Sequence, residues 1–182
     1  MTQRVQISVI GSSEGDERVL RDAEAVGRGI AEAGAVLVCG GLTGVMEAAS
    51  RGAAEAGGTV LAVLPTLDPA DANPHVTLAI ATGTGHARNL AVVASGAAVI
   101  AVGGEWGTLS EIAYARKLGR PVVAIQSWTL RNRLGTDLGI VEAQTADEAV
   151  RAALSAAVVG QSSKDRTEAA DESLDRPEAG RS

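Results

Sequence analysis

AAVIAVGGEWGTLSEIAYARKLGRPVVAIQ, residues 97–126, contains the unit that decides the fold. It begins with a short apolar run rich in β-branched residues, AAVIAVGG (97–104), and ends with another, PVVAIQ (121–126). A helical segment at about 109–118 lies between them. Runs of this kind, bounded by glycine or proline, are typical of strands buried on both faces of a parallel sheet. The stretch therefore predicts a strand, a helix and a second strand in succession.

The same pattern occurs earlier in the chain. Four further apolar runs precede this unit: VQISVIG (5–11), AVLVCGG (35–41), TVLAVLP (59–65) and VTLAIAT (76–82). Helices are expected at about 16–33, 44–56 and 86–95, with a last one near 146–158. Alternating strands and helices predict an α/β fold, a Rossmann-like doubly wound and mostly parallel sheet in a single domain.

The domain is expected to span residues 1–159. From Gly160 onward the apolar periodicity stops, and residues 160–182 mix charged residues with Ser, Pro and Gly. Such a composition cannot bury enough apolar surface to fold alone, so this polar tail is expected to be disordered.

Composition excludes several classes of function. The net charge is −6, and Lys and Arg do not cluster, which argues against a nucleic acid as partner. No apolar run reaches the roughly 18 to 20 residues needed to cross a membrane, and the N-terminus enters a strand pattern at once, so we expect a cytoplasmic protein without membrane contact. The single cysteine, Cys39, excludes an internal disulfide, supplies no metal-ligand cluster and is expected to be a buried, inert thiol. No metal site is expected.

Two glycine-rich loops follow predicted strands, GGLTG (40–44) and GGEWG (103–107). In open parallel sheets the ligand lies beyond the carboxyl ends of the strands, where backbone amides and helix dipoles favour an anion such as phosphate. One such loop alone could be a tight turn, but two on the same edge favour an anion site. Neither loop has the Lys-Ser/Thr ending of a P-loop or the spacing of a dinucleotide fingerprint, so ATP hydrolysis and NAD chemistry are disfavoured.

Glu111 has two interpretations. Thr108 and Glu111 have the spacing of a capping box, in which the threonine hydroxyl and the glutamate carboxylate accept from backbone amides at a helix start. Thr145 and Glu148 have the same spacing with no glycine loop before them. The spacing alone therefore leaves open whether Glu111 caps its helix or serves a functional site.

Arg88 is expected near a helix start, where the helix dipole disfavours a cation unless an anion is close. A ligand phosphate or Glu111 would be such an anion, and a solvated arginine is the alternative. His86 and His75 lie in loops and could transfer protons, or be caps or surface residues. Trp106 could stack on a planar base or close its loop over the core.

Four of these segments together resemble the Lonely Guy family: GSS (11–13), GGLTGVMEAASRGA (40–53), ARN (87–89) and GGEWGTLSE (103–111). The resemblance covers residue 5 to about residue 125. It implies a Rossmann-like homodimer or homotetramer that needs no cofactor. It also implies hydrolysis of the N-glycosidic bond of nucleoside 5′-monophosphates, notably cytokinin ribotides.

The resemblance also implies roles for individual residues. Arg88 and Glu111 match the catalytic pair of the family; a carboxylate would stabilise the oxocarbenium-like state and orient water, and an arginine would hold the phosphate or the leaving base. The positions expected to bind the ligand and its phosphate are Ser12, Gly40, Gly41, Thr43, Gly44, Gly103, Gly104, Gly107 and Thr108.

Two residues depart from the family pattern. Val102 stands where the family has proline, and Asn89 stands where it has lysine after the arginine. The stretch DANPHVTLAIATGTGHARN (71–89) also resembles a sister branch that includes molybdenum cofactor carrier proteins, which bind a phosphorylated pterin without cleaving it. We therefore expect a phosphorylated small molecule as partner. The expected activity is hydrolysis of a nucleoside monophosphate, and the alternative is a non-catalytic carrier with bound molybdenum cofactor.

Overall fold

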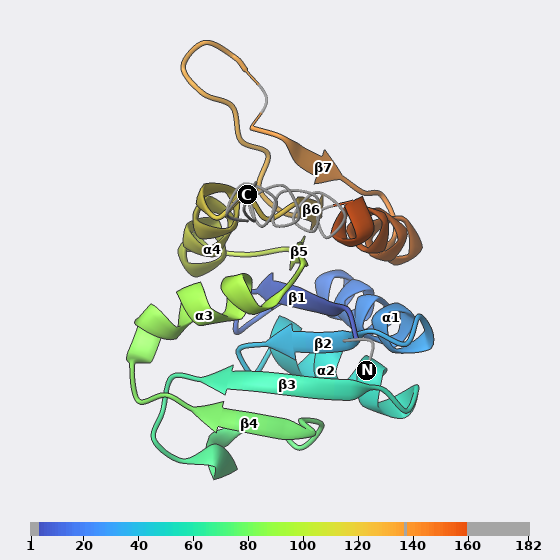
Figure 1. The fold of residues 1–182 in the computed structure, drawn as a ribbon, viewed down its shortest axis with the longest axis vertical. Helices are drawn as coiled ribbons and strands as arrows, with labels where there is room; N and C mark the ends of the chain where they lie inside the picture. Colours follow the sequence, from blue (N-terminus) through green and yellow to red (C-terminus); the bar gives the residue numbers. More distant parts are fainter. Residues whose placement is uncertain (1–3, 137, 160–182) are drawn as a thin grey trace, which may run out of the picture.

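The described part of the chain forms one sheet of seven parallel strands in the order β4-β3-β2-β1-β5-β6-β7 (Figure 1). The computed structural model describes residues 4–136 and 138–159, so the expected tail at 160–182 lies outside the described residues. The strands are β1 (Gln6–Gly11), β2 (Val36–Cys39), β3 (Thr59–Leu64), β4 (Leu78–Ala81), β5 (Ala98–Val102), β6 (Val122–Ile125) and β7 (Ile140–Glu142). The Rossmann-like α/β fold predicted from the sequence is confirmed.

Helices cover both faces of this sheet (Figure 1). On one face lie α1 (Glu17–Glu32), α2 (Val45–Glu55) and a last helix at 146–159, whose buried residues join one apolar cluster. On the other face lie α3 (Arg88–Ser95) and α4 (Trp106–Lys117), which belong to a second cluster. Two short 3-10 helices, η1 (Pro69–Asp71) and η2 (Gly85–Ala87), lie in the connections on either side of β4. Among the described residues, no helix has both the length and the apolarity needed to cross a membrane.

The strand order fixes where a ligand site is expected. The chain runs from β1 through β2 and β3 to β4 on one side, and then returns to β5 on the other side of β1. The helices that follow β1 and β5 pack on opposite faces of the sheet. The loops leaving these two strands therefore diverge, and such a switch point is where open α/β sheets bind ligands.

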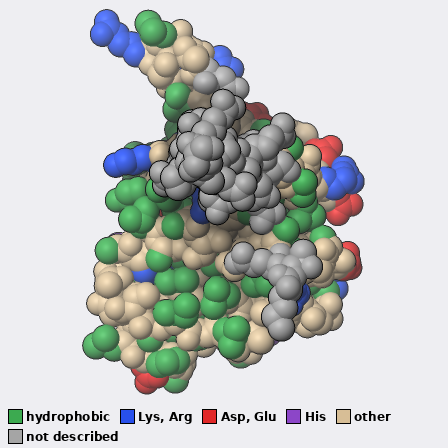
Figure 2. Space-filling view, viewed as in Figure 1, with side chains coloured by type: hydrophobic (Ala, Val, Ile, Leu, Met, Phe, Trp, Pro, Cys, Tyr) green, Lys and Arg blue, Asp and Glu red, His purple; other side chains and the backbone are tan. Residues whose placement is uncertain are grey.

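The face that bears α3 and α4 is covered unevenly. The connection from β3 to β4 contains only the three-residue helix η1, so it supplies no α-helix to cover the outer part of the sheet. Figure 2 shows hydrophobic side chains over β3 and β4 on this face. Leu78 and Ile80 of β4 remain 58% and 52% exposed.

The opposite face shows very close helix packing. A Cβ atom added at Gly27 of α1 would collide with the carbonyl oxygen of Ala49 on α2, and one at Gly52 of α2 would collide with the carbonyl of Glu24. The two helix backbones therefore touch with no side chain between them. The chain has almost no aromatic residues, and these two helices pack through small residues instead.

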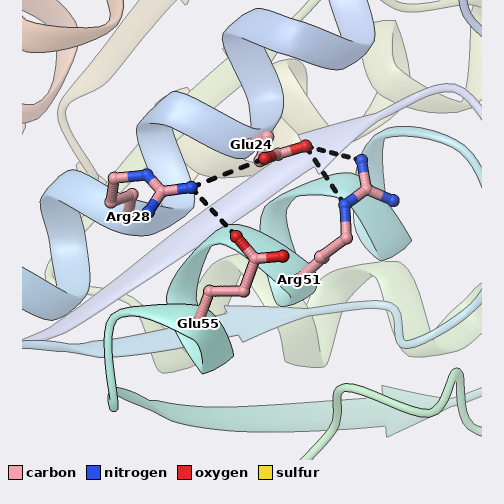
Figure 3. Close-up of polar contacts among 4 residues, drawn as sticks. All are labelled: Glu24, Arg28, Arg51 and Glu55. Atoms are coloured by element: carbon pink, nitrogen blue, oxygen red, sulfur yellow. Dashed lines mark hydrogen bonds and ion pairs between the residues drawn. The ribbon is translucent and has the colours of Figure 1, made fainter.

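Charged side chains join α1 and α2 beside this contact (Figure 3). Glu24 of α1 accepts from both Nε and Nη2 of Arg51 on α2, at 3.1 and 2.6 Å, and these hydrogen bonds lower the pKa of Glu24. Arg28 of α1 approaches Glu24 at 3.5 Å and Glu55 of α2 at 3.0 Å. All four side chains are partly exposed, so the network aligns the helices more than it stabilises them.

Gly27→Ala should lower the free energy of unfolding, because the added methyl group forces the backbones of α1 and α2 apart. Gly29→Ala on the same helix is the matched control, since its Cβ would meet only the Val150 side chain, at 3.2 Å. Both changes gain roughly 1 kcal/mol of helix propensity. We expect Gly27→Ala to be less stable than Gly29→Ala by about 2 kcal/mol in urea denaturation. Equal stability of the two variants would show that the helices separate without cost.

Candidate functional site

A cavity of about 340 Å³ lies at the carboxyl edge of the sheet, beside the switch point. Its apolar lining residues are Val9 and Ile10 near the end of β1, Leu42 of the loop after β2 and Met46 of α2. Its polar wall comes from the loop after β1, from the start of α3 and from the first turns of α4. The cavity therefore joins segments that are far apart in the sequence.

Arg88 and Glu111 form an ion pair in the wall of this cavity. Arg88 is the first residue of α3 and Glu111 lies on α4, and Arg88 Nη1 is 3.6 Å from Glu111 Oε1. Their side chains are only 10% and 7% exposed. Burial raises the pKa of Glu111 to about 7, although the charge of Arg88 acts in the opposite direction. Burial likewise lowers the pKa of Arg88, and the carboxylate of Glu111 counters this.

The structure decides against the capping interpretation of Glu111. Helix α4 begins at Trp106, three residues before the expected start, and Glu105 is its N-cap residue. Thr108 therefore lies inside the helix, where its hydroxyl caps nothing, and Glu111 faces Arg88. The helix starts early because Gly103 and Gly104 adopt positive φ angles of 56° and 122°, which turn the chain directly after β5.

The same spacing at Thr145 does form a cap. The hydroxyl of Thr145 accepts from the amide of Glu148 at 3.2 Å, and the Glu148 carboxylate accepts from the amide of Gln144 at 2.8 Å. Two identical spacings in one chain thus have different structures, and the difference lies in the loop that precedes each helix.

Two buried polar atoms of the cavity residues lack a hydrogen-bond partner within the described part of the chain. They are Nε of Arg88 and Oγ1 of Thr108. Buried polar groups in folded proteins are nearly always paired, because an unpaired one keeps the full cost of its desolvation. Thr108 is 2% exposed, so bulk water has little access to hydrogen-bond its hydroxyl. A polar ligand in the cavity would supply the missing partners.

Helix N-termini add backbone donors at this edge. The first amides of α1 are already bound, since Asp16 accepts from Arg18 and Val19, both at 2.9 Å. Helices α2, α3 and α4 have no side-chain cap. Gly107 and Thr108, in the first turn of α4, line the cavity. Their amides and the positive end of the helix dipole favour an anion here.

The structure brings six of the expected site residues together in the cavity lining: Ser12, Gly40, Arg88, Gly107, Thr108 and Glu111. Gly40 has a specific structural reason to lack a side chain, because a Cβ atom there would collide with the guanidinium group of Arg88. The arginine therefore reaches the cavity by passing directly over the backbone of the glycine-rich loop 40–44.

The other five expected positions are not among the lining residues: Gly41, Thr43, Gly44, Gly103 and Gly104. They shape the loops instead. Thr43 Oγ1 donates to the carbonyl of Ser13 at 3.1 Å, and Gly44 packs on the backbone of Ser13. These contacts join the loop after β1 to the loop after β2.

Some lining residues were not expected from the sequence. Leu42 lies in the glycine-rich loop 40–44, Met46 follows that loop on α2, and Glu105 lies in the glycine-rich loop 103–107. Asn89 lines the cavity and is 8% exposed. Leu42 could be noticed in the sequence as an apolar residue inside a glycine-rich loop, but the sequence does not show which way its side chain points.

The remaining candidates separate clearly. His86 lines the cavity, and His75 is not among the lining residues. Trp106 is 77% exposed and packs against Trp128, with ring centroids 5.6 Å apart, so its ring does not line the cavity. Cys39 is buried, and burial raises the pKa of its thiol, as an inert cysteine requires. The described residues contain no group of three or more metal-ligating side chains.

Fold and cavity together define a Rossmann-like α/β protein with a cleft at the switch point of its sheet. Residues 4–159 match the SLOG cluster4 family, and the chain belongs to this family. The resemblance to Lonely Guy-like proteins, in a branch close to molybdenum cofactor carriers, is confirmed.

Three similar proteins illustrate this placement. An uncharacterized protein from Archaeoglobus fulgidus is 49% identical over 122 residues, covering 67% of this chain and 80% of that protein. The molybdenum cofactor binding protein of the phototrophic bacterium Rippkaea orientalis is 34% identical, with a TM-score of 0.77 over 85% of this chain and 98% of that one. The molybdenum cofactor carrier protein from Chlamydomonas reinhardtii is 33% identical, with a TM-score of 0.73 over 82% and 96%.

Glu111→Gln should change how stability depends on pH. The pKa of Glu111 rises from 4.5 to about 7, so the folded state binds a proton more tightly than the unfolded state. The stabilisation that this tighter proton binding gives to the folded state is fully present below pH 4.5 and is lost as pH rises to about 7. Relative to Glu111→Gln, the wild type should lose up to about 3 kcal/mol of unfolding free energy across this interval.

Urea denaturation at a series of pH values measures this difference. The matched control is Glu148→Gln, which removes an exposed carboxylate three residues after a threonine, the same separation in the sequence as for Glu111. The proposed titration of Glu111 would be wrong if both variants changed the free energy of unfolding with the same dependence on pH.

Proposed function

We propose that the protein binds a phosphorylated pterin or a related nucleotide-like molecule in this cavity, with molybdenum cofactor as the best-supported ligand. The observation that supports this proposal most directly is the pair of unpartnered buried atoms, Arg88 Nε and Thr108 Oγ1, beside the uncapped N-terminus of α4. Two of the similar solved structures are named for the molybdenum cofactor that they bind or carry.

The cavity suits such a ligand in size and lining. Its volume falls within the roughly 300 to 1,000 Å³ of typical small-molecule sites. Leu42 and Met46 add apolar side chains to the lining, against which a planar ring can pack. Arginine and lysine are represented among the lining residues by Arg88 alone. The phosphate would therefore depend on the amides of α4 and the Thr108 hydroxyl at least as much as on cationic side chains.

A second function, hydrolysis of a nucleoside 5′-monophosphate, is supported by the position of Glu111. In this reaction the bond between the ribose C1′ and the base nitrogen breaks, water adds to C1′, and the base leaves with a proton. An ionised Glu111 would stabilise the positive charge that develops on the sugar, and Arg88 would hold the phosphate or the departing base. With a pKa of about 7, Glu111 can also receive the proton that the attacking water loses.

Thr108→Val should weaken binding of the ligand, because it removes the unpartnered hydroxyl and keeps the side-chain volume. We expect the dissociation constant of molybdenum cofactor, measured by calorimetry without oxygen, to rise by about five- to tenfold, which corresponds to one lost hydrogen bond. The matched control is Thr145→Val, which removes the cap of the last helix outside the cavity. Equal affinities of both variants and the wild type would remove Thr108 from the site.

Base release from a panel of nucleoside 5′-monophosphates tests the second function. If the protein is a hydrolase, Glu111→Gln should lower the rate by at least about a hundredfold, since it removes the charge under the sugar. Glu148→Gln should leave the rate unchanged. No release from any nucleotide, together with tight binding of molybdenum cofactor, would leave the carrier function alone. Failure to bind any of these ligands would contradict both functions.

A further inference from the structure

The two tryptophans of the chain lie together beside the cavity. Trp106 is the first residue of α4, and Trp128 follows the end of β6. Their ring centroids are 5.6 Å apart and their planes are tilted by 39°. Trp128 packs against the apolar cluster that contains buried residues of α4, and its indole N–H donates to the carbonyl of Glu105 at 3.3 Å. Because Trp128 is fixed in these two ways, its contact with Trp106 restrains the ring of Trp106.

Trp106 nevertheless leaves most of its surface in water, since it is 77% exposed. It does not belong to a larger apolar surface. Glu105 and Gly107, on either side of it, are exposed, and so is Ser110, one turn further along α4. A protein interface of ordinary size needs far more surface than one ring offers. The ring of Trp106 therefore suits a small planar partner better than another protein.

The surface between the cavity and Trp106 is open. Glu105 and Gly107 both line the cavity, and Trp106 lies between them in the sequence. A Cβ atom added at Gly107 would meet no heavy atom of the described residues within 4 Å. Gly107 is also part of a helix, where alanine is the better helix former. The described part of the chain thus gives no steric reason for glycine here, whereas a ligand that passes close over the start of α4 would give one.

The start of α4 also connects the two regions electrostatically. This helix has no side-chain cap, so its first amides and its dipole favour an anion between the cavity and Trp106. The cavity volume, about 340 Å³, is at the lower end of the range for small-molecule sites. One ring with its phosphate is therefore enough to occupy it. A further group attached to that phosphate would leave the cavity over Gly107 and reach Trp106.

We propose that Trp106 is a stacking site for a second aromatic ring of the ligand, which makes the ligand a dinucleotide, with two ring systems joined through a pyrophosphate. This inference rests on the proposed function, which places the first ring in the cavity and a phosphate at the start of α4. The second ring lies on the exposed surface of Trp106. Every base has a π-face, so stacking on Trp106 adds affinity for a second ring without selecting a particular base.

Calorimetry with two guanine nucleotides tests the stacking site. Diguanosine pyrophosphate and GDP-mannose both have a guanosine on a pyrophosphate of the same charge, and only the first has a second aromatic base. The wild type should bind diguanosine pyrophosphate about tenfold more tightly. Trp106→Ala should abolish this difference, and Trp106→Phe should keep most of it. The matched control is Tyr114→Ala, which removes another exposed aromatic side chain of α4 and should keep the whole difference.

Tryptophan fluorescence gives a second measurement. The chain has only two tryptophans, so Trp106 alone provides the signal in Trp128→Phe. Diguanosine pyrophosphate should quench this signal, and GDP-mannose should leave it nearly unchanged. Equal affinity of the wild type for the two nucleotides, a difference that persists in Trp106→Ala, or failure of both nucleotides to bind would overturn the stacking site. Binding of molybdenum cofactor tests the proposed function separately, because it contributes no second ring.

Discussion

The arrangement of the candidate site depends on one buried ion pair, Arg88 with Glu111, which joins the start of α3 to α4 in the wall of the cavity. Removing two charges from water is expensive, and a single contact of 3.6 Å returns only part of that cost. The raised pKa of Glu111 and the lowered pKa of Arg88 show that burial outweighs their attraction. A hydrophobic pair of similar volume would stabilise the fold better, so the pair is best understood as part of a site.

The surrounding elements keep this pair in place by bringing backbone very close to it. Gly40 lets the guanidinium group of Arg88 cross the loop 40–44, and Gly103 and Gly104 start α4 early enough to direct Glu111 toward Arg88. Glycine also permits close approach on the opposite face of the sheet, where Gly27 and Gly52 bring the backbones of α1 and α2 into contact. With so few aromatic side chains, the chain gains its tight packing from short distances between elements.

Much of this architecture could be predicted from the sequence, because buried parallel strands have a strong signature. Six of the seven strands were expected within two residues or so of their ends; β7 was missed because three residues, Ile140–Glu142, are too few to show a pattern. The sequence left open whether Arg88 meets Glu111, a ligand phosphate or solvent, and in the structure it forms an ion pair with Glu111. Sequence could not decide between a cap and an ion pair for Glu111, because Thr108 and Thr145 have the same spacing to a glutamate. It also could not separate lining glycines such as Gly107 from loop-forming ones such as Gly41, since this depends on which way each backbone turns.

Cleaving and carrying a ligand make different demands on the same carboxyl group. Hydrolysis needs Glu111 ionised beneath the sugar, and its ionised form is supported by the charge of Arg88. A phosphate that drew Arg88 toward itself would remove that support inside a buried site, raise the pKa of Glu111 further and leave it neutral at physiological pH. A neutral acid would stabilise no positive charge on a sugar and would instead donate a hydrogen bond to the ligand. Of the two proposed functions, hydrolysis would therefore require Arg88 to stay beside Glu111 and hold the departing base, whereas a phosphate that engaged Arg88 would favour the carrier.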